Sequence, residues 1–372
     1  MFLALREMRH SKARYSLIMV IMLLVSFLVL FVTGLARGLA YANISAVEKL
    51  PANYFAVQKD AEHTFRRSQL SETELTAARS ITGEQNASPL AVQMSTITAD
   101  KADVKADITF FAVDMDGMLA PKVSQGTSIT NETQGSVIAD SKLKESGVTI
   151  GSSIKDQASG LIFKVAGFVE NSSYSHTPVV YINNLDWQAM RQGAGQGGEG
   201  AQNVPYNVVA LHATSAQASE LAAKLDNVEV ITQKQAIASI PGYSAEQNSL
   251  LMMIVFLFVI AAFVLAVFFY VITIQKTSQF GILKAMGTRM SYLAWSVVGQ
   301  VMILSVASLA VSLLLTLGMN MGLPDTMPFQ LEGKTILLTC VLFVGMSLLG
   351  SLISVAKVAR VDALEAIGRA GA

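Results

Sequence analysis

The chain has 372 residues, 52% of them hydrophobic, and its 27 Lys and Arg residues are balanced by 27 Asp and Glu residues. A formal net charge of zero gives no indication of nucleic-acid binding, so we expect no nucleic-acid partner. The single cysteine, Cys340, excludes an intrachain disulfide and a thiolate metal site. The phosphate-binding pattern Gly-x-x-x-x-Gly-Lys-Ser/Thr does not occur, so we do not expect the chain to bind ATP in the usual way.

Residues 1–14 form a short basic segment whose apolar and basic side chains fall on opposite sides of a helical wheel. This pattern predicts an amphipathic helix in the headgroup region of the cytoplasmic leaflet. A secretory signal peptide is the alternative, because it also begins basic and then becomes apolar. The uncharged run at 15–36 is longer than the apolar region of a signal peptide, which favours a retained anchor.

Four apolar runs are long enough to cross a bilayer, which takes ~20 helical residues. One of them carries no charge from Gln247 to Gln275 and is apolar on all sides, which is not typical of a helix in a soluble protein. The predicted segments are an amphipathic helix (1–14), a first span with an outer extension (15–50), a large domain (51–243), a second span (244–275), a cytoplasmic connection (276–290), a third span (291–318), an outer loop (319–334), a fourth span (335–357) and a tail (358–372).

Basic residues predict the orientation of the spans. Four Lys or Arg residues precede the first span. Lys357 ends the fourth span, and Arg360 and Arg369 follow it. Because short basic flanks stay in the cytoplasm, both termini are predicted to be cytoplasmic and the large domain extracytoplasmic.

The large domain has the pattern of an α+β fold. Strand patterns occur at 54–58, 106–113, 160–168, 178–182 and 206–211, and helical patterns at 183–191 and 215–225. Ser71-Glu-Thr-Glu74 is a capping box that opens a helix. The stretch GAGQGGEG at 193–200 lacks the Lys and the flanking strand of a phosphate loop, so we interpret it as a flexible surface loop.

Several motifs give the chain a family resemblance. They are LALREMRHSKARY (3–15), FVTGLARGLAYANIS (31–45), AEQNSLLMMIV (245–255), FFYVITIQKTSQFGILKAMG (268–287) and VDALEAIG (361–368). With the order of spans, they resemble the MacB/FtsX-type (type VII) ABC transporter permeases, and within them the haem-exporting permeases of bacterial plasma membranes. The resemblance implies an α-helical membrane domain of four spans with a large α+β extracytoplasmic domain between the first and second. It also implies a non-catalytic homodimer that works with two copies of a separate cytoplasmic ABC ATPase, where ATP and Mg²⁺ would bind.

The connection at 276–290 is predicted to be the element that couples to the ATPase. The apolar side chains of Phe280, Ile282, Leu283 and Met286 would enter a groove on the ATPase, and Lys284 would pair with an acid at the rim of that groove. Gly281 and Gly287 are expected to bracket one or two helical turns. An ordinary basic loop between two spans is the alternative.

A haem site is predicted on the outer extension of the first span. Arg37, Tyr41, Ile44 and Glu48 recur on one helical face, and Asn43 lies among them. In a two-fold dimer, the two Arg37 side chains would meet the haem propionates and the two Glu48 carboxylates would face the iron. Alternatively, these charges only mark the membrane boundary.

Further candidates for haem binding are less specific. Met252 and Met253 could ligate the iron through their thioethers, or could simply be deformable packing. Tyr243 belongs to a polar collar above them, which could line a lateral entrance or simply face water. Tyr174 and His176 are two residues apart, so on a strand their side chains would share a face, although such a pair is also common in exposed loops. Apart from haem iron we expect no metal. Gly34 and Gly38 are spaced to let two helices approach closely.

The predicted mechanism is lateral capture of haem between the first and second spans, followed by ATP-driven expulsion to the outside. Haem would be the transported substrate, and no cofactor would be permanently bound. One rival is the export of another amphiphile, such as a peptide antibiotic or a lipoprotein. The other is an FtsX-like signalling protein that regulates a wall enzyme and carries nothing.

Overall fold

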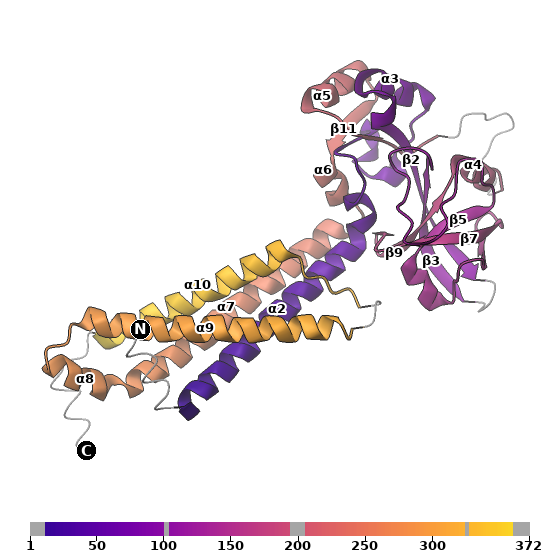
Figure 1. Ribbon diagram of the computed structural model, residues 1–372. Coiled ribbons are helices and arrows are strands. Elements are labelled where there is room, and N and C mark those ends of the chain that lie inside the picture. Colours follow the sequence, from indigo (N-terminus) through magenta and orange to yellow (C-terminus); the bar gives the residue numbers. More distant parts are fainter. Residues whose placement is uncertain (1–11, 100–103, 194–204, 324–326, 360–372) are drawn as a thin grey trace. The chain divides into compact units, whose positions relative to one another are not determined.

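The computed structural model describes residues 12–99, 104–193, 205–323 and 327–359 (Figure 1). The chain divides into two compact units: a membrane unit of residues 1–38 and 248–372, and an external unit of residues 39–247. Most of the predicted amphipathic helix, most of the glycine-rich stretch and most of the C-terminal tail lie outside the described residues.

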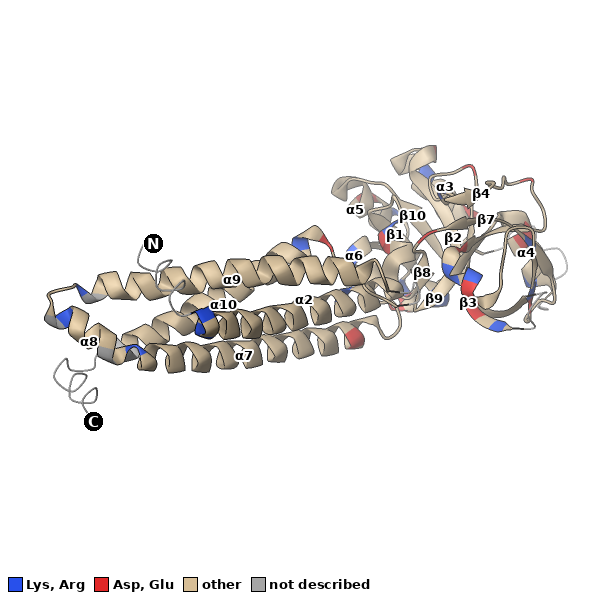
Figure 2. Ribbon diagram, turned by 60° about the horizontal axis from the view of Figure 1, so that its bottom comes forward, with Lys and Arg blue, Asp and Glu red and all other residues tan. Residues whose placement is uncertain are grey.

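Four long helices match the predicted spans. They are α2 (Lys12–Glu48), α7 (Tyr243–Gln275), α9 (Met290–Asn320) and α10 (Gly333–Ala359). Each of these helices is long enough and apolar enough to cross a membrane. Apart from Arg37 in α2, the Lys, Arg, Asp and Glu residues of these helices lie near the helix ends (Figure 2). Exposed apolar side chains such as Phe263 and Trp295 are suited to contact lipid.

The membrane helices pack through apolar contacts and through small polar side chains. Met22, Leu265 and Phe343 are buried in one shared cluster. The hydroxyls of Ser26 and Ser312 lie 2.5 Å apart and join α2 to α9. Such hydrogen bonds and small residues hold helices together in lipid, where the hydrophobic effect does not drive helix association.

The external unit contains one mixed sheet in the order β11-β1-β10-β2-β3-β9-β5-β7-β4, with β6 paired to β2 and β7, and β8 paired to β9. The strands are β1 (Tyr54–Gln58), β2 (Ala87–Ala99), β3 (Lys105–Val113), β4 (Gln125–Gly126), β5 (Ser136–Asp140), β6 (Ser153–Asp156), β7 (Ile162–Val169), β8 (Ser173–Tyr174), β9 (Thr177–Ile182), β10 (Val208–Leu211) and β11 (Val228–Thr232). The β3–β9 and β5–β7 pairs are parallel and the remaining pairs are antiparallel. The helices of this unit are α3 (Glu72–Thr82), α4 (Asn184–Gly193), α5 (Ser215–Lys224) and α6 (Gln233–Ala238).

The outer end of α2 is part of the core of the external unit. Ile44, Val47 and Leu50 are buried with Phe55 and Phe111 in one cluster. Burial of this face fixes the last turns of the helix against the sheet. The helices and strands predicted in this unit are confirmed, including the helix α3, which the capping box of Ser71 and Glu74 opens.

Candidate functional site

The short helix α8 (Thr277–Ala285) and the turn after it present apolar side chains on the surface of the membrane unit. Ile282 is 52% exposed and Met286 is 68% exposed, whereas Phe280 and Leu283 are half-buried. Lys284 is exposed on the same helix. An exposed apolar patch next to a positive charge is suited to a groove on a partner protein.

Gly287 ends this helix in a Schellman motif. Its φ of +88° is in the left-handed region, which glycine adopts without strain. The N–H of Thr288 donates to Leu283 O, and the N–H of Gly287 donates to Lys284 O, each at 3.0 Å. The prediction that Gly281 also bounds the element is wrong, because Gly281 is buried inside α8.

Lys276, which was counted with the basic connection, is buried where α7 meets α8 and is only 2% exposed. Its Nζ donates to Tyr15 OH at 2.7 Å and to Gln300 Oε1 at 2.9 Å. Tyr15 OH in turn donates to Gln300 Oε1 at 2.8 Å. These three residues belong to α2, α9 and the junction of α7 with α8. Lys276 therefore ties the short helix to two other spans.

Arg37 pairs with an acid of its own chain. Its Nε and Nη2 both donate to Glu332 Oε1, at 3.0 and 2.6 Å. The Arg37 side chain is 23% exposed and that of Glu332 38% exposed. An Arg37 that contacts a haem propionate would share its guanidinium with Glu332 or give up this ion pair.

Gly34 and Gly38 form a surface that the outer loop of the same chain covers, rather than a second helix. A Cβ at Gly38 would lie 2.1 Å from Pro328 O, and one at Gly34 would lie 2.6 Å from the Phe329 ring. The N–H of Gln330 donates to Gly34 O at 3.1 Å. The two glycines therefore allow a close approach, but the partner is the loop before α10.

The predicted haem-binding face of α2 is only partly accessible. Tyr41 and Glu48 are half-buried, whereas Ile44 is 2% exposed and Asn43 is 1% exposed. The ammonium of Lys49 lies 5.9 Å from the centre of the Tyr41 ring. The expectation that Ile44 lines a haem site is wrong for this structure, because its side chain belongs to the core of the external unit.

The candidates on α7 are more accessible than those on α2. Met252 is 58% exposed and Met253 45% exposed. Tyr243 is half-buried, and its hydroxyl accepts a hydrogen bond from Gln247 Nε2 at 3.1 Å. The thioethers are thus open to a ligand or to lipid.

The spacing of Tyr174 and His176 predicted that the two side chains would share a strand face. In the structure they do not. β8 ends at Tyr174, and Ser175 and His176 form a two-residue turn with φ values of 50° and 64°. Tyr174 is 1% exposed and packs edge-on against Phe111, with 5.6 Å between ring centres. Burial raises the pKa of the Tyr174 hydroxyl, so neither access nor charge favours a phenolate ligand here.

His176 points instead toward two helix ends. Its Nε2 lies 3.2 Å from Asn43 Nδ2 and 3.0 Å from Glu246 Oε2. Asn43 Nδ2 is 2.9 Å from the same Glu246 oxygen. The turn also donates the N–H of Ser175 to Asn43 O at 2.8 Å. This contact between the end of α2, the β8–β9 turn and the first turn of α7 has no signal in the sequence.

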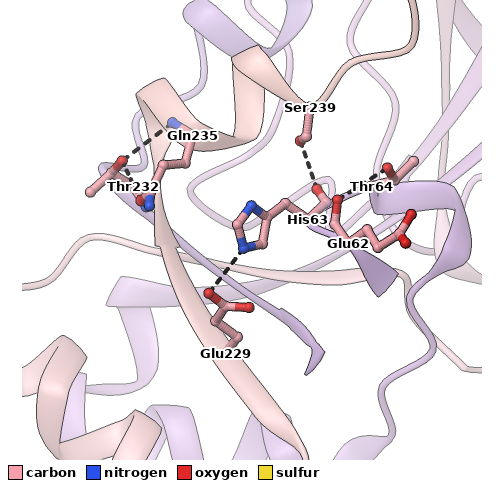
Figure 3. Close-up of polar contacts among 7 residues, drawn as sticks. All are labelled: Glu62, His63, Thr64, Glu229, Thr232, Gln235 and Ser239. Carbon is pink, nitrogen blue, oxygen red and sulfur yellow. Dashed lines mark hydrogen bonds and ion pairs between the residues drawn. The ribbon is translucent and has the colours of Figure 1, made fainter. Parts of the chain in front are cut away.

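His63 forms a comparable pair at another place in the external unit. Its Nε2 lies 2.9 Å from Glu229 Oε1, and Ser239 Oγ donates to its backbone O at 2.8 Å. Figure 3 shows this pair beside the capping box in which Thr232 and Gln235 cap α6.

A cavity of about 400 Å³ also lies in the external unit. Lys49, Lys122 and Glu170 provide its charged groups, and Met118 and Tyr181 are among its apolar lining residues. Burial lowers the pKa of Lys49 and raises the pKa of Tyr181 to about 12. The volume is within the usual range for small-molecule pockets, ~300–1,000 Å³. Charges of both signs around it do not select for an anion or a cation.

Known proteins are similar to this chain in sequence. Residues 251–363 match the family described as FtsX-like permease C-terminal. The chain is 31% identical over 368 residues to a Staphylococcus haemolyticus protein that carries the name hemin transport system permease protein HrtB, and the match covers 99% of each chain. The protein of the same name from Staphylococcus epidermidis is 31% identical over 371 residues, again with 99% of each chain covered.

A solved structure is also similar to part of the chain. The periplasmic region of MacB from Actinobacillus actinomycetemcomitans matches with a TM-score of 0.36 and 14% sequence identity, covering 54% of this chain and 98% of that chain.

The chain belongs to the FtsX-like ABC transporter permeases. Within that family, its full-length relatives carry the name HrtB. It is therefore a transporter subunit of the membrane, with four spans and a large extracytoplasmic domain inserted after the first.

Proposed function

We propose that the chain captures haem from the membrane and expels it outward, driven by ATP hydrolysis in a separate HrtA-like ATPase. The observation that carries this proposal is the match to relatives named as hemin transport permeases over 99% of both chains. The sequence holds no phosphate-binding loop, which supports ATP and Mg²⁺ binding in the partner subunit alone. Export of excess haem would serve detoxification.

The working assembly is a homodimer of this chain with two ATPase copies on the cytoplasmic side, where both termini lie. The exposed side chains of Ile282 and Met286 support docking of α8 on the ATPase. Closure of the ATPase dimer would press α8, and rigid helices would carry that displacement across the membrane.

The proposed haem site is the outer end of α2, where Tyr41 and Glu48 remain open enough to contact an apolar macrocycle or its iron. Met252 and Met253 of the membrane unit are accessible candidates by themselves. Glu48 is the proposed oxygen ligand, because carboxylates and phenolates bind oxidised iron. Haem partitions into lipid, so lateral entry between the first and second spans needs no aqueous path.

The test is a haem titration of the purified, haem-free permease in nanodiscs. We expect a shift of the Soret band with saturable binding, and at least tenfold weaker binding for Glu48→Ala. Glu84→Ala, which removes an exposed carboxylate of the external unit, is the matched control and should bind like wild type. Unchanged affinity in Glu48→Ala would remove this site, whereas absence of any Soret shift would favour another amphiphile as substrate.

Arg37 needs a second comparison, since Glu332 already pairs with it. If Arg37 binds a propionate, Arg37→Ala weakens haem binding and Glu332→Gln does not. Equal losses in both variants would instead assign Arg37 a role in holding the outer loop.

A further inference from the structure

The contact of Asn43, His176 and Glu246 cannot be satisfied by hydrogen bonds alone. A carboxamide nitrogen only donates, a carboxylate only accepts, and an imidazole nitrogen carries one proton or none. If His176 Nε2 is protonated, it and Asn43 Nδ2 are two donors that face each other at 3.2 Å. If Nε2 is not protonated, it and Glu246 Oε2 are two acceptors that face each other at 3.0 Å. One side of this triangle is unfavourable in either protonation state.

The other end of the Asn43 side chain adds to this imbalance. Asn43 is 1% exposed, and its Oδ1 is buried with no hydrogen-bond partner in the described structure. A buried carbonyl oxygen without a partner is costly, and such groups call for an explanation. Rotation of the amide by a half turn exchanges Oδ1 and Nδ2, atoms of nearly equal size. The oxygen then faces His176 and Glu246.

With that rotation, the three facing atoms are one imidazole nitrogen, one carboxylate oxygen and one carboxamide oxygen. Their separations of 2.9, 3.0 and 3.2 Å are close to ~3.0 Å, the distance between neighbouring ligands of an octahedral ion with bonds of ~2.1 Å. A cation beside this face, ~2.1 Å from each of the three atoms, would take a lone pair from each of them as a ligand. We propose that Asn43, His176 and Glu246 bind a divalent transition-metal cation.

The donor set indicates the class of metal. An imidazole nitrogen suits Zn²⁺, Fe²⁺, Co²⁺ or Ni²⁺ better than Ca²⁺ or Mg²⁺, which prefer oxygen alone. The side chains of His176 and Glu246 are 44% and 20% exposed, so water can reach the site and complete the coordination. Among the described residues, no group of three or more His, Cys, Asp or Glu side chains is placed to hold a metal, which makes the carboxamide essential here.

A metal in this place would join three segments of the external unit. Asn43 lies near the outer end of α2, His176 in the turn between β8 and β9, and Glu246 in the first turn of α7. Cross-linking them would stiffen the contact between the sheet and the ends of the two helices that enter this unit. Metal binding does not depend on haem, so it stands or falls separately from the proposed transport.

The experiment is a titration of tag-free, haem-free, full-length permease with Co²⁺ and then Zn²⁺, followed by Co²⁺ absorption and by calorimetry. We expect one saturable site per chain, with affinity at least tenfold lower in His176→Ala and in Glu246→Gln. Asn43→Asp adds a second carboxylate and should tighten binding. The chain has only four histidines, so background binding is low.

His63→Ala is the matched control, because His63 and Glu229 form another His–carboxylate pair at 2.9 Å. Among the described residues, no third His, Cys, Asp or Glu is placed to complete a metal site with that pair, and the control should bind metal like wild type. Absence of a saturable site, or equal binding by wild type and His176→Ala, would overturn the proposal. His176 is half-exposed, so His176→Ala is expected to fold, and retention of the wild-type elution volume verifies this.

Discussion

At the scale of single residues, two charged side chains have partners that no local sequence pattern predicted. Lys276 was expected in a basic connection, but it is 2% exposed and bonds to Tyr15 and Gln300. Arg37 was expected to face a ligand, but it pairs with Glu332 of the outer loop. In each case the partner lies more than twenty residues away. Local patterns therefore give the residue type and its helix, but not the group that it contacts.

Replacement of Lys276 tests the buried network. Lys276→Met removes two hydrogen bonds from a charged donor, each worth ~1.5–3 kcal/mol in proteins. We expect the melting temperature of the purified permease to fall by several degrees. Lys284→Met is the matched control: Lys284 is exposed eight residues further on, so the melting temperature should stay unchanged while co-purification of the ATPase decreases. Equal melting temperatures for the two variants would show that Lys276 does not hold the helices together.

Asp140 is expected to make the free energy of unfolding of the external unit depend on pH. Burial raises the pKa of this carboxyl above its ordinary value of 3.8, although backbone N–H groups of Lys142 and Ser172 donate to it. The folded chain therefore holds this proton more tightly than the unfolded chain does. It follows that the contribution of Asp140 to the free energy of unfolding falls as pH rises from 3.8 through the raised native pKa.

Asp140→Asn should remove this contribution. Relative to the variant, wild type should lose stability as the pH is raised from about 4 to about 7, as measured by thermal unfolding of the full chain at each pH. Asp226→Asn, which changes an exposed carboxyl, should follow wild type throughout. If the difference between wild type and Asp140→Asn is constant over this range, the pKa of Asp140 is not raised.

At the scale of helices and strands, hydropathy and alternation predicted most elements. The strand expected at 54–58 is β1, and the expected helices at 183–191 and 215–225 correspond to α4 and α5. The longest strand, β2, was missed because ASPLAVQMSTITA contains a proline and many weak strand formers. Its pairing with β10, β3 and β6 stabilises it through contacts that are distant in sequence.

The site residues were less predictable than the elements. The β8–β9 turn uses Ser175 and His176 at positive φ, where Asn and Gly are the usual signal. Without that signal, Tyr174 and His176 were assigned to one strand. The meeting of His176 with Asn43 and Glu246 depends on three segments that are 133 and 70 residues apart, so no local pattern contains it.

A glycine on α2 provides the test at this scale. In Gly38→Ala the new Cβ would lie 2.1 Å from Pro328 O, so the outer loop has to move. We expect a lower melting temperature and faster proteolysis of the loop before α10. Gly345→Ala is the control, because nothing lies within 4 Å of a Cβ there, and a helical Gly→Ala change is worth ~1 kcal/mol in the favourable direction. Weaker dimerisation of Gly38→Ala with an unchanged loop would instead place the glycine face between two copies.

At the scale of the whole molecule, the order of one span, an α+β domain and three spans was predicted from the positions of apolar runs and of strand and helix patterns along the sequence, and it is confirmed. The identity of the transported molecule could not be predicted from composition, because apolar spans are compatible with any amphiphile that partitions into lipid. The family identifies the chain as an ABC transporter permease. The relatives named HrtB make haem the first cargo to test.

The most direct measurement is haem transfer by the permease and its ATPase, reconstituted into liposomes that hold haem in the bilayer. An apo-haem protein on the side of the extracytoplasmic domain reports the haem that leaves the membrane. Our account predicts transfer that requires both ATP and the ATPase subunit, and that is lost when α8 is uncoupled by Gly281→Pro. Haem release at the same rate without ATP, or ATP-driven release of a different amphiphile with haem left in the bilayer, would contradict it.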